Sequence, residues 1–255
     1  PAMQNFNDNT NVGYSVDINN EGNIIAVTNQ KSSGEKGAGF LAGDVRTFFW
    51  SGDEWLLFGR WLGKDSNQTI GNCVALNGSG RRIALHNNTI EIWDYILQVD
   101  PRENIETTYD WVLQYKFPPN QSGNPSHLDF NSTGDLLLAR WASYGILYKR
   151  EVDTSTFPHT VSYVKVGEGI FDYGQAENQF FSGLDASPIA LSVVRNRLIA
   201  TDNSVKQLDT NLSKYWRTLG NAFEEAIDAD IDDNGDTIAF AYASPQVVKV
   251  FRRDN

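Results

Sequence analysis

Short clusters of Asp, Asn and Gly recur along the 255-residue chain, with the spacing found in the first half of a calcium-binding loop. Oxygens at positions one, three and five of such a loop can converge on Ca²⁺, and a glycine at position six permits the bend. The most complete copy contains Asp230, Asp232, Asn234 and Asp236. Positions nine and twelve, where an acidic ligand would complete the site, hold Ile238 and Ala241. A plain hairpin turn explains the same residues, so calcium is kept as an alternative and no other cofactor is expected.

Each cluster lies inside a longer repeat that consists of an apolar strand, a turn and a second apolar strand ending in Ala. The five copies are residues 16–26, 74–84, 128–139, 190–200 and 229–239. In the turn, an Asn or Asp side chain can accept backbone N–H groups, and a glycine can adopt positive φ. A unit of this size cannot bury its apolar face alone, so it must stack on its neighbours.

Two further apolar segments follow most copies of the repeat and complete a four-stranded unit. The expected third strands are residues 45–50, 89–94, 145–149, 204–208 and 247–252, and the expected fourth strands are residues 54–61, 110–117, 161–166 and 215–219. Four short strands in each unit of about 40–60 residues are typical of propeller blades. Large aromatic residues near the start of the fourth strand, Trp55, Trp111 and Trp216, are expected to pack between adjacent blades.

The sequence therefore predicts an all-β chain that forms a single β-propeller over residues 1–255. We expect five blades of four antiparallel strands, at about residues 11–69, 70–124, 125–178, 179–226, and 227–255 together with 1–10. The fifth unit stops after its third strand, and residues 1–6 have no blade of their own. These residues are expected to supply the missing strand and close the ring, which would remove the exposed edges. A fragment of a longer array, with an open edge, is the alternative.

Residues 13–63 resemble the FG-GAP type of β-propeller repeat, as found in integrin α-subunit heads and in many bacterial and algal surface proteins. The resemblance is carried by G-Y-S-V-D-I-N-N-E-G-N-I-I-A-V and by G-D-V-R-T-F-F-W-S-G-D-E-W-L-L-F-G. The second unit is similar to a WD repeat through I-E-I-W-D at residues 90–94. The resemblance implies a propeller used for recognition, with no inherited catalytic residue. FG-GAP calcium loops carry a further Asp that this chain lacks.

Charge and composition limit the classes of partner. A net charge of −11 repels polyphosphate, so nucleic acid is not expected as a partner. No apolar segment approaches the roughly 20 residues that a membrane span needs. The single cysteine, Cys73, is expected to be a buried, unreactive thiol. The localisation is open, although an excess of Asn-x-Ser/Thr sites favours a secreted or surface protein: Asn67, Asn77, Asn87, Asn120, Asn131 and Asn211.

In a propeller, the loops from second to third strands lie on the same face as the connections between blades. The first unit has a long loop here, residues 29–43, and the connections 63–72, 118–125 and 167–179 are expected beside it. Long irregular loops often carry function, although passive surface loops are the alternative. The candidate partner-binding residues are Lys31, Glu35, Lys36, Phe40, Phe171, Asp172 and Tyr173. A second long loop, residues 95–109, is expected on the opposite face.

The preferred function is a non-catalytic binding or scaffold propeller that recognises a protein, peptide or glycan through one loop face. One alternative is a structural component of a surface or virion assembly. Another is a propeller-type glycoside hydrolase, which would need paired carboxylates. The carboxylates on or beside expected first strands are Asp17, Asp129, Asp185, Asp228 and Asp230. The turn accounts for three of them, so no catalytic residue is assigned.

Overall fold

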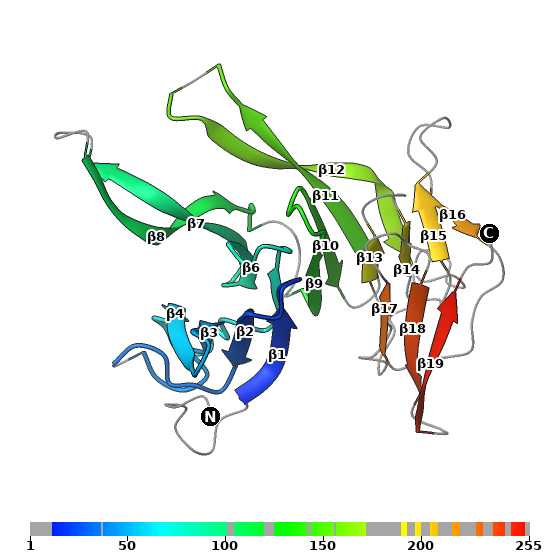
Figure 1. Cartoon of the computed structure of the whole chain (residues 1–255), viewed down its shortest axis with the longest axis horizontal. Coiled ribbons are helices and arrows are strands. Elements are labelled where there is room, and N and C mark those ends of the chain that lie inside the picture. The colour runs from blue at the N-terminus through cyan, green and yellow to red at the C-terminus, as the bar shows by residue number, and fades with distance from the viewer. Residues whose placement is uncertain are drawn as a thin grey trace. The chain divides into compact units, whose positions relative to one another are not determined.

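The computed structural model describes residues 12–36, 38–100, 105–119, 125–141, 144–155, 157–171, 190–192, 197–199, 205–208, 216–219, 228–231, 237–242 and 246–252. All regular secondary structure in these residues is β-strand (Figure 1). The chain divides into two compact units, residues 1–128 with 152–162, and residues 129–151 with 163–255. Among the described residues there is no helix long and apolar enough to cross a membrane.

The first unit contains two four-stranded antiparallel sheets in which consecutive strands are neighbours. The first sheet is formed by β1 (Val12–Ile18), β2 (Ile24–Asn29), β3 (Asp44–Trp50) and β4 (Trp55–Leu62). The second is formed by β5 (Val74–Leu76), β6 (Arg82–His86), β7 (Ile90–Asp100) and β8 (Ile105–Lys116). Both sheets have the simple meander order of a propeller blade.

Three more sheets follow along the chain. The third contains β9 (His127–Phe130), β10 (Leu136–Trp141), β11 (Tyr144–Asp153) and β12 (Thr160–Phe171). The fourth contains β13 (Ala190–Ser192), β14 (Arg197–Ile199), β15 (Val205–Leu208) and β16 (Trp216–Leu219). The fifth has three described strands, β17 (Asp228–Ile231), β18 (Thr237–Tyr242) and β19 (Val247–Arg252). The five predicted units are therefore five sheets. Residues 1–11 lie outside the described residues, so ring closure stays a prediction.

The repeated turn is a hairpin turn held by a buried asparagine. In the three described copies, the side-chain Oδ1 accepts the backbone N–H of the first residue of the next strand: Asn19 from Ile24 at 2.9 Å, Asn77 from Arg82 at 3.0 Å and Asn131 from Leu136 at 2.9 Å. The glycines of these turns have positive φ: 69° at Gly22, 69° at Gly80 and 72° at Gly134. The plain-turn interpretation is thus confirmed for these three copies.

Asp17 has a different role from the one expected, because it does not belong to the turn. Its Oδ2 accepts the backbone N–H of Leu76 in β5 at 2.6 Å. Two residues earlier on the same strand, Ser15 Oγ accepts the N–H of Val74 at 3.3 Å. Residues 15 and 17 point to the same side of β1, because side chains alternate along a strand. The two side chains therefore tie the first strand of one sheet to the first strand of the next.

An apolar core fills the space between the first two sheets. Its buried members are Ala26, Val45, Trp61, Ile70, Val74, Leu76, Ile83 and Leu85. Trp111 of β8 packs against this core and lies 5.2 Å from the Trp61 ring, as its predicted inter-blade role requires. Gly59 makes room for Trp111, since a Cβ there would meet the indole nitrogen. Trp55 differs from the prediction, because its ring packs on Trp50 of its own sheet at 5.4 Å. Trp216 lies in β16, and its side chain is outside the described residues.

Residues 95–109 were expected to form a long loop, and this prediction is wrong. The pairing of β7 with β8 continues from Glu91↔Lys116 to Asp100↔Ile105, so most of the segment is a two-stranded ribbon (Figure 1). The Tyr95 and Tyr109 rings stack across the ribbon with centroids 5.6 Å apart. Such cross-strand aromatic pairs stabilise an antiparallel ribbon. The residues Ile96, Leu97 and Val99 favour a strand, which the charged residues of the segment obscured.

Candidate functional site

The long loop of the first unit and the connection to the second sheet are joined by backbone hydrogen bonds. Gly63 donates to Gly43 and accepts from Glu35, at 3.0 and 2.8 Å. Residues 67, 69 and 70 donate to residues 40, 41 and 42, respectively. A Cβ on Gly43, whose φ is 90°, would collide with the Ile70 backbone, so this close approach requires glycine. The described residues of segments 29–43 and 63–72 therefore form one surface, here called the loop face.

Four predicted binding residues lie on the loop face. Lys31, Glu35 and Lys36 are exposed, and Phe40 has 70% of its surface accessible. An exposed phenyl ring on a loop that is fixed by its backbone is a possible anchor for a partner. The loop is packed against the rest of the sheet, because Ala38 and Ala42 are buried and Ser66 Oγ donates to Ala38 O at 3.0 Å.

The other three predicted binding residues stay a prediction. Phe171 is the last residue of β12, which continues through residues 167–171, where a loop was expected. That prediction is corrected because the segment from Val166 to Phe171 continues the strand. The side chain of Phe171 and the whole of Asp172 and Tyr173 lie outside the described residues.

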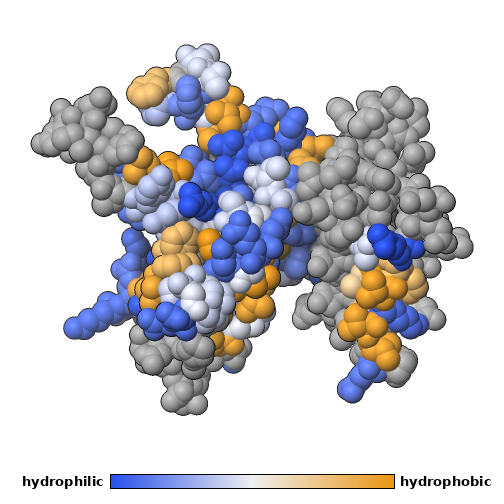
Figure 2. Space-filling view, in the orientation of Figure 1, coloured by the Kyte–Doolittle hydropathy of each residue, from blue (hydrophilic) through white to orange (hydrophobic). Residues whose placement is uncertain are grey.

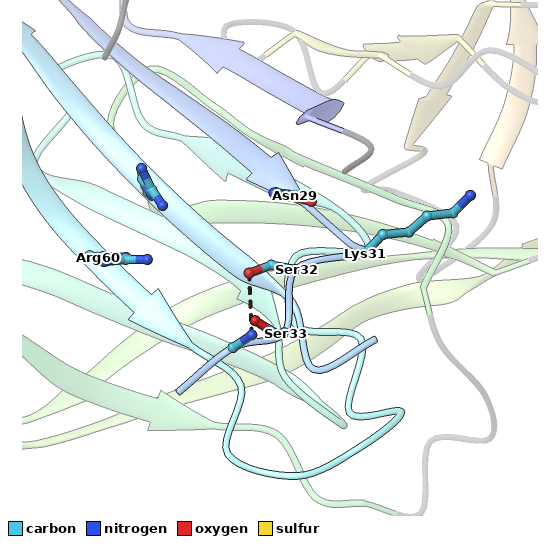
Figure 3. A pocket seen from close by; sticks show the side chains of 7 residues that line it. Asn29, Lys31, Ser32, Ser33 and Arg60 are labelled. Atoms are coloured by element: carbon cyan, nitrogen blue, oxygen red, sulfur yellow. Dashed lines mark hydrogen bonds between the residues drawn. The ribbon is translucent and has the colours of Figure 1, made fainter. Parts of the chain in front are cut away.

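A polar pocket of about 220 Å³ lies beside the loop, and the sequence did not single it out. Its lining residues are Asn29, Lys31, Ser32, Ser33, Gly34, Arg46 and Arg60. Arg46 comes from β3 and Arg60 from β4. Asn29 is the last residue of β2, and the other four residues lie in the loop that follows it. In the close view, Arg60 and the serines lie on opposite sides of the space, and Lys31 extends away from them (Figure 3).

Asp44 holds both arginines of the pocket. Its Oδ2 accepts from Arg46 Nη2 at 2.6 Å and from Arg60 Nη2 at 2.9 Å, and Arg60 Nε donates to Oδ1 at 3.2 Å. The Asp44 side chain is 1% exposed, and those of Arg46 and Arg60 are 9% and 40% exposed. A buried carboxylate needs such partners, and two guanidinium groups fix its position. One carboxylate balances one of the two arginines, so Asp44, Arg46 and Arg60 taken together carry one net positive charge.

The second sheet contains a related pair near the same end of its third strand. Glu91 of β7 is buried and accepts from Lys116 Nζ of β8 at 2.8 Å. Trp93 Nε1 and Asn87 Nδ2 also donate to this carboxylate, at 3.2 and 3.0 Å. Each of the first two sheets thus buries an acid on its third strand and pairs it with a base on its fourth. The sequence shows an acid at each of these third strands and a base on each fourth strand, but only the strand pairing shows that they meet.

Cys73 is buried, as the sequence predicted. It is 2% exposed, and its Sγ donates to the backbone oxygen of Pro125 at 3.3 Å. Burial raises the pKa of this thiol far above its ordinary range, because the thiolate would lose its hydration. A nucleophilic role at neutral pH is therefore disfavoured.

The calcium alternative falls mostly outside the described part of the chain. Asp230 lies in β17, where its backbone pairs with Ala239, and Asp232, Asn234 and Asp236 are not described. Among the described residues, no group of three or more His, Cys, Asp or Glu side chains could hold a metal ion. The equivalent residues Asn19, Asn77 and Asn131 satisfy backbone N–H groups instead.

Several Asn-x-Ser/Thr sites have structural roles that explain their presence. Asn77 and Asn131 are 8% and 2% exposed and hold the repeated turns. Asn87 accepts from Gln68 Nε2 and donates to Glu91. Asn67, in contrast, is exposed and has a φ of 60°. The excess of these motifs therefore follows in part from the turn chemistry of the repeat.

Likeness to solved structures with a TM-score above 0.5 supports the fold. Neither a protein-family model nor the sequence of a curated protein matches this chain. Among solved structures, Kluyveromyces lactis Hsv2 aligns with a TM-score of 0.55 and 12% identity, over 96% of this chain and 61% of that chain. A functionally unknown protein from Desulfotomaculum acetoxidans aligns with a TM-score of 0.51 and 11% identity, over 94% and 65% of the two chains. The Cps50 (Swd1) β-propeller domain of Myceliophteria thermophila gives a TM-score of 0.48 and 11% identity, over 94% and 66%.

This chain spans less than two thirds of the length of each of these structures. At such low identities, structural likeness bears on the fold alone. The repeated four-stranded meander is the feature of the chain itself that is typical of this fold. The protein has a β-propeller fold.

Proposed function

We propose that the protein is a non-catalytic recognition module that binds a protein or peptide through its loop face. The observation that carries this proposal is the exposed Phe40 ring on a loop whose backbone is bonded to residues 63–70. Aromatic side chains that enter a partner's pocket contribute disproportionately to binding energy. The exposed charges of Lys31, Glu35 and Lys36 on the same loop would form a polar rim.

The rigidity of the loop supports this role. Binding costs less conformational entropy when the contact surface is ordered before the partner arrives. Here the bonds from residues 67, 69 and 70 and the buried Ala38 and Ala42 fix the loop in the free protein. A passive surface loop would not need this framework.

The similarity to FG-GAP and WD repeats in residues 13–63 and 90–94 agrees with a recognition role. A glycan partner remains the alternative ligand class for the same face, and a surface or virion assembly remains the alternative function. A glycoside hydrolase is not favoured by the described carboxylates, because Asp17 and Asp44 are engaged by the backbone of β5 and by two arginines.

The test is a selection of ligands for the full chain from a random peptide display library, with a glycan array in parallel. Binding of the selected ligand is then measured for Phe40→Ser and Lys36→Glu, each on the loop face. Arg81→Glu is the control, because Arg81 is exposed in the β5–β6 turn at the other end of the strands. We expect Phe40→Ser to weaken binding by about tenfold or more, as for a hot-spot residue. Equal binding by all three variants would refute the assignment of this face.

A further inference from the structure

We infer that the pocket beside the loop binds an oxyanionic group, a carboxylate or a phosphate, carried by the partner. This inference rests on the proposed function, because the pocket opens between the loop residues and the two arginines of the same sheet. It says which chemical group of the partner would bind at the part of the loop face next to the pocket, where Phe40 does not lie.

The charge of the pocket is opposite to that of the protein. The chain carries −11, yet the pocket is lined by the two guanidinium groups of Arg46 and Arg60. Asp44 balances one of these charges and holds the two guanidinium groups in place. Arg60 binds Asp44 through Nε and Nη2 only, so its Nη1 has no hydrogen bond to the described residues. A guanidinium that is fixed on one edge and open on the other suits an anion.

Neutral donors complete the wall that faces the arginines. Ser32 and Ser33 both line the pocket, and Ser33 is exposed with no recorded side-chain hydrogen bond within the described segments. Ser32 Oγ accepts from Gly34 N at 3.2 Å, which leaves its hydroxyl hydrogen available to donate. Hydroxyl groups opposite a guanidinium can share the oxygens of one bound anion.

Asn29 supplies an independent sign of a ligand. It is 3% exposed and lines the pocket, and its Oδ1 is buried without a hydrogen-bond partner among the described residues. Leaving a buried polar atom unsatisfied costs about 1–3 kcal/mol, so native structures seldom retain one without a reason. Its Nδ2 has no hydrogen bond among the described residues and can donate to an anion, and an O–H on the bound group, as on a monoprotonated phosphate, would satisfy Oδ1.

The pocket is large enough for one anionic group of the partner but not for a whole drug-sized molecule. Its volume of about 220 Å³ is below the roughly 300–1,000 Å³ of pockets that enclose drug-sized molecules. A carboxylate or phosphate fits, and the rest of the partner would lie across the loop face. The Asp44 ion pairs alone would explain a link between β3 and β4. They do not explain the serines and the unsatisfied amide on the other side of the space.

The experiment is an NMR titration of the full chain with two probes, inorganic phosphate and acetate, at ionic strength held constant with chloride. In the native protein we expect saturable shifts of the residue 32–34 amides and of the Arg60 Nε–H. If both probes bind, the pocket accepts oxyanions in general. If only phosphate binds, the partner group is a phosphoryl group, and if only acetate binds, it is a carboxylate. Absence of saturable shifts at tens of millimolar for either probe would overturn the inference.

Two pocket variants and one matched control make the test specific. Arg60→Gln removes a pocket charge while Arg46 still pairs with Asp44, and Ser33→Asp adds a repelling charge at an exposed position. Each is expected to weaken binding about tenfold or more, the effect of losing a charge-assisted hydrogen bond. Arg81→Gln makes the same change in a turn away from the pocket and should leave binding unchanged. Equal weakening in Arg81→Gln would mean that net charge alone attracts the ion, which contradicts a site.

The peptide ligands selected for the loop face separate this inference from the proposed function. If Phe40→Ser abolishes peptide binding while Arg60→Gln and Ser33→Asp leave both peptide and anion binding intact, the loop face stands and the anion pocket fails. If the anion titration saturates but no loop-face variant affects a selected ligand, the proposed recognition surface fails and the pocket stands as a separate anion site.

Discussion

The turn asparagines allow a stability prediction that distinguishes a structural turn from an ion site. In the first turn, Asn19 is 4% exposed, and its Oδ1 accepts from Asn23 N at 3.0 Å and from Ile24 N at 2.9 Å. Asn19→Ala removes both acceptor interactions and leaves two backbone N–H groups without a partner in a partly buried turn. At about 1–2 kcal/mol for each lost partner, the free energy of unfolding should fall by about 2–4 kcal/mol. That loss is a large fraction of the roughly 5–15 kcal/mol that stabilises a typical domain.

Two comparison variants isolate the cause. Asn19→Asp keeps the acceptor oxygens and loses only the Nδ2 bond to Asn23, so we expect a cost of about 1 kcal/mol or less. The fifth turn carries Asp232 at this position, which shows that the repeat accepts an acid there. Asp53→Ala, at an exposed position in the β3–β4 turn, should change stability by no more than about 0.5 kcal/mol.

The assay is urea unfolding followed by tryptophan fluorescence, since Trp61, Trp93 and Trp111 lie together at the core of the first unit. The urea unfolding of each variant is measured with and without calcium. If the turn is purely structural, the loss in the free energy of unfolding should increase in the order Asp53→Ala, Asn19→Asp, Asn19→Ala, and calcium should not change that order. A loss below about 0.5 kcal/mol for Asn19→Ala, within the range of ordinary surface substitutions, would refute the reasoning. So would a calcium-dependent gain in stability that Asn19→Ala abolishes.

Three further predictions follow from particular contacts. Gly59→Ala should destabilise the first unit by about 1–3 kcal/mol, because the added methyl would overlap Trp111 and Thr47, and thermal melting with Trp111 fluorescence measures it. Cys73 should resist a thiol-specific reagent at pH 8 in the native protein and react fully in urea. Because burial raises its pKa, the contribution of Cys73 to stability is complete below the ordinary thiol pKa and declines at higher pH. Hydrogen bonds from Ser155 hold the pKa of Asp153 below its ordinary value, so Ser155→Ala should raise that pKa in an NMR titration. The native Asp153 carboxylate favours folding above its ordinary pKa, and this stabilisation is lost as the pH falls through the lowered pKa of the folded state.

The repeat predicted most of the architecture because local physics and packing agree in it. The turn residues, the two-residue alternation of the strands and the apolar faces all indicate the same blade, and the structure confirms those strands. The prediction failed where a segment's charge concealed its strand preference, as in residues 95–109. It also assigned Asp17 to the turn, because one sequence cannot show that a carboxylate reaches the backbone of the next blade.

The candidate site was only partly accessible from sequence. The long loop indicated the surface that bears Lys31 and Phe40, because loop length and composition are local properties. The pocket depends on register: Arg46 lies opposite Arg60 across β3 and β4, and the start of β3 is paired with Asn29. No spacing along the chain shows that residues 29, 44, 46 and 60 meet, and only strand pairing brings them together.

Hydrogen–deuterium exchange of the full chain, with and without a library-selected peptide ligand, tests the recognition surface most directly. The account predicts that the ligand slows exchange in residues 29–43 and 63–72 and leaves the turns at residues 19–23, 51–54 and 77–81 unchanged. Slower exchange confined to those turns, with the loop face unaffected, would contradict it.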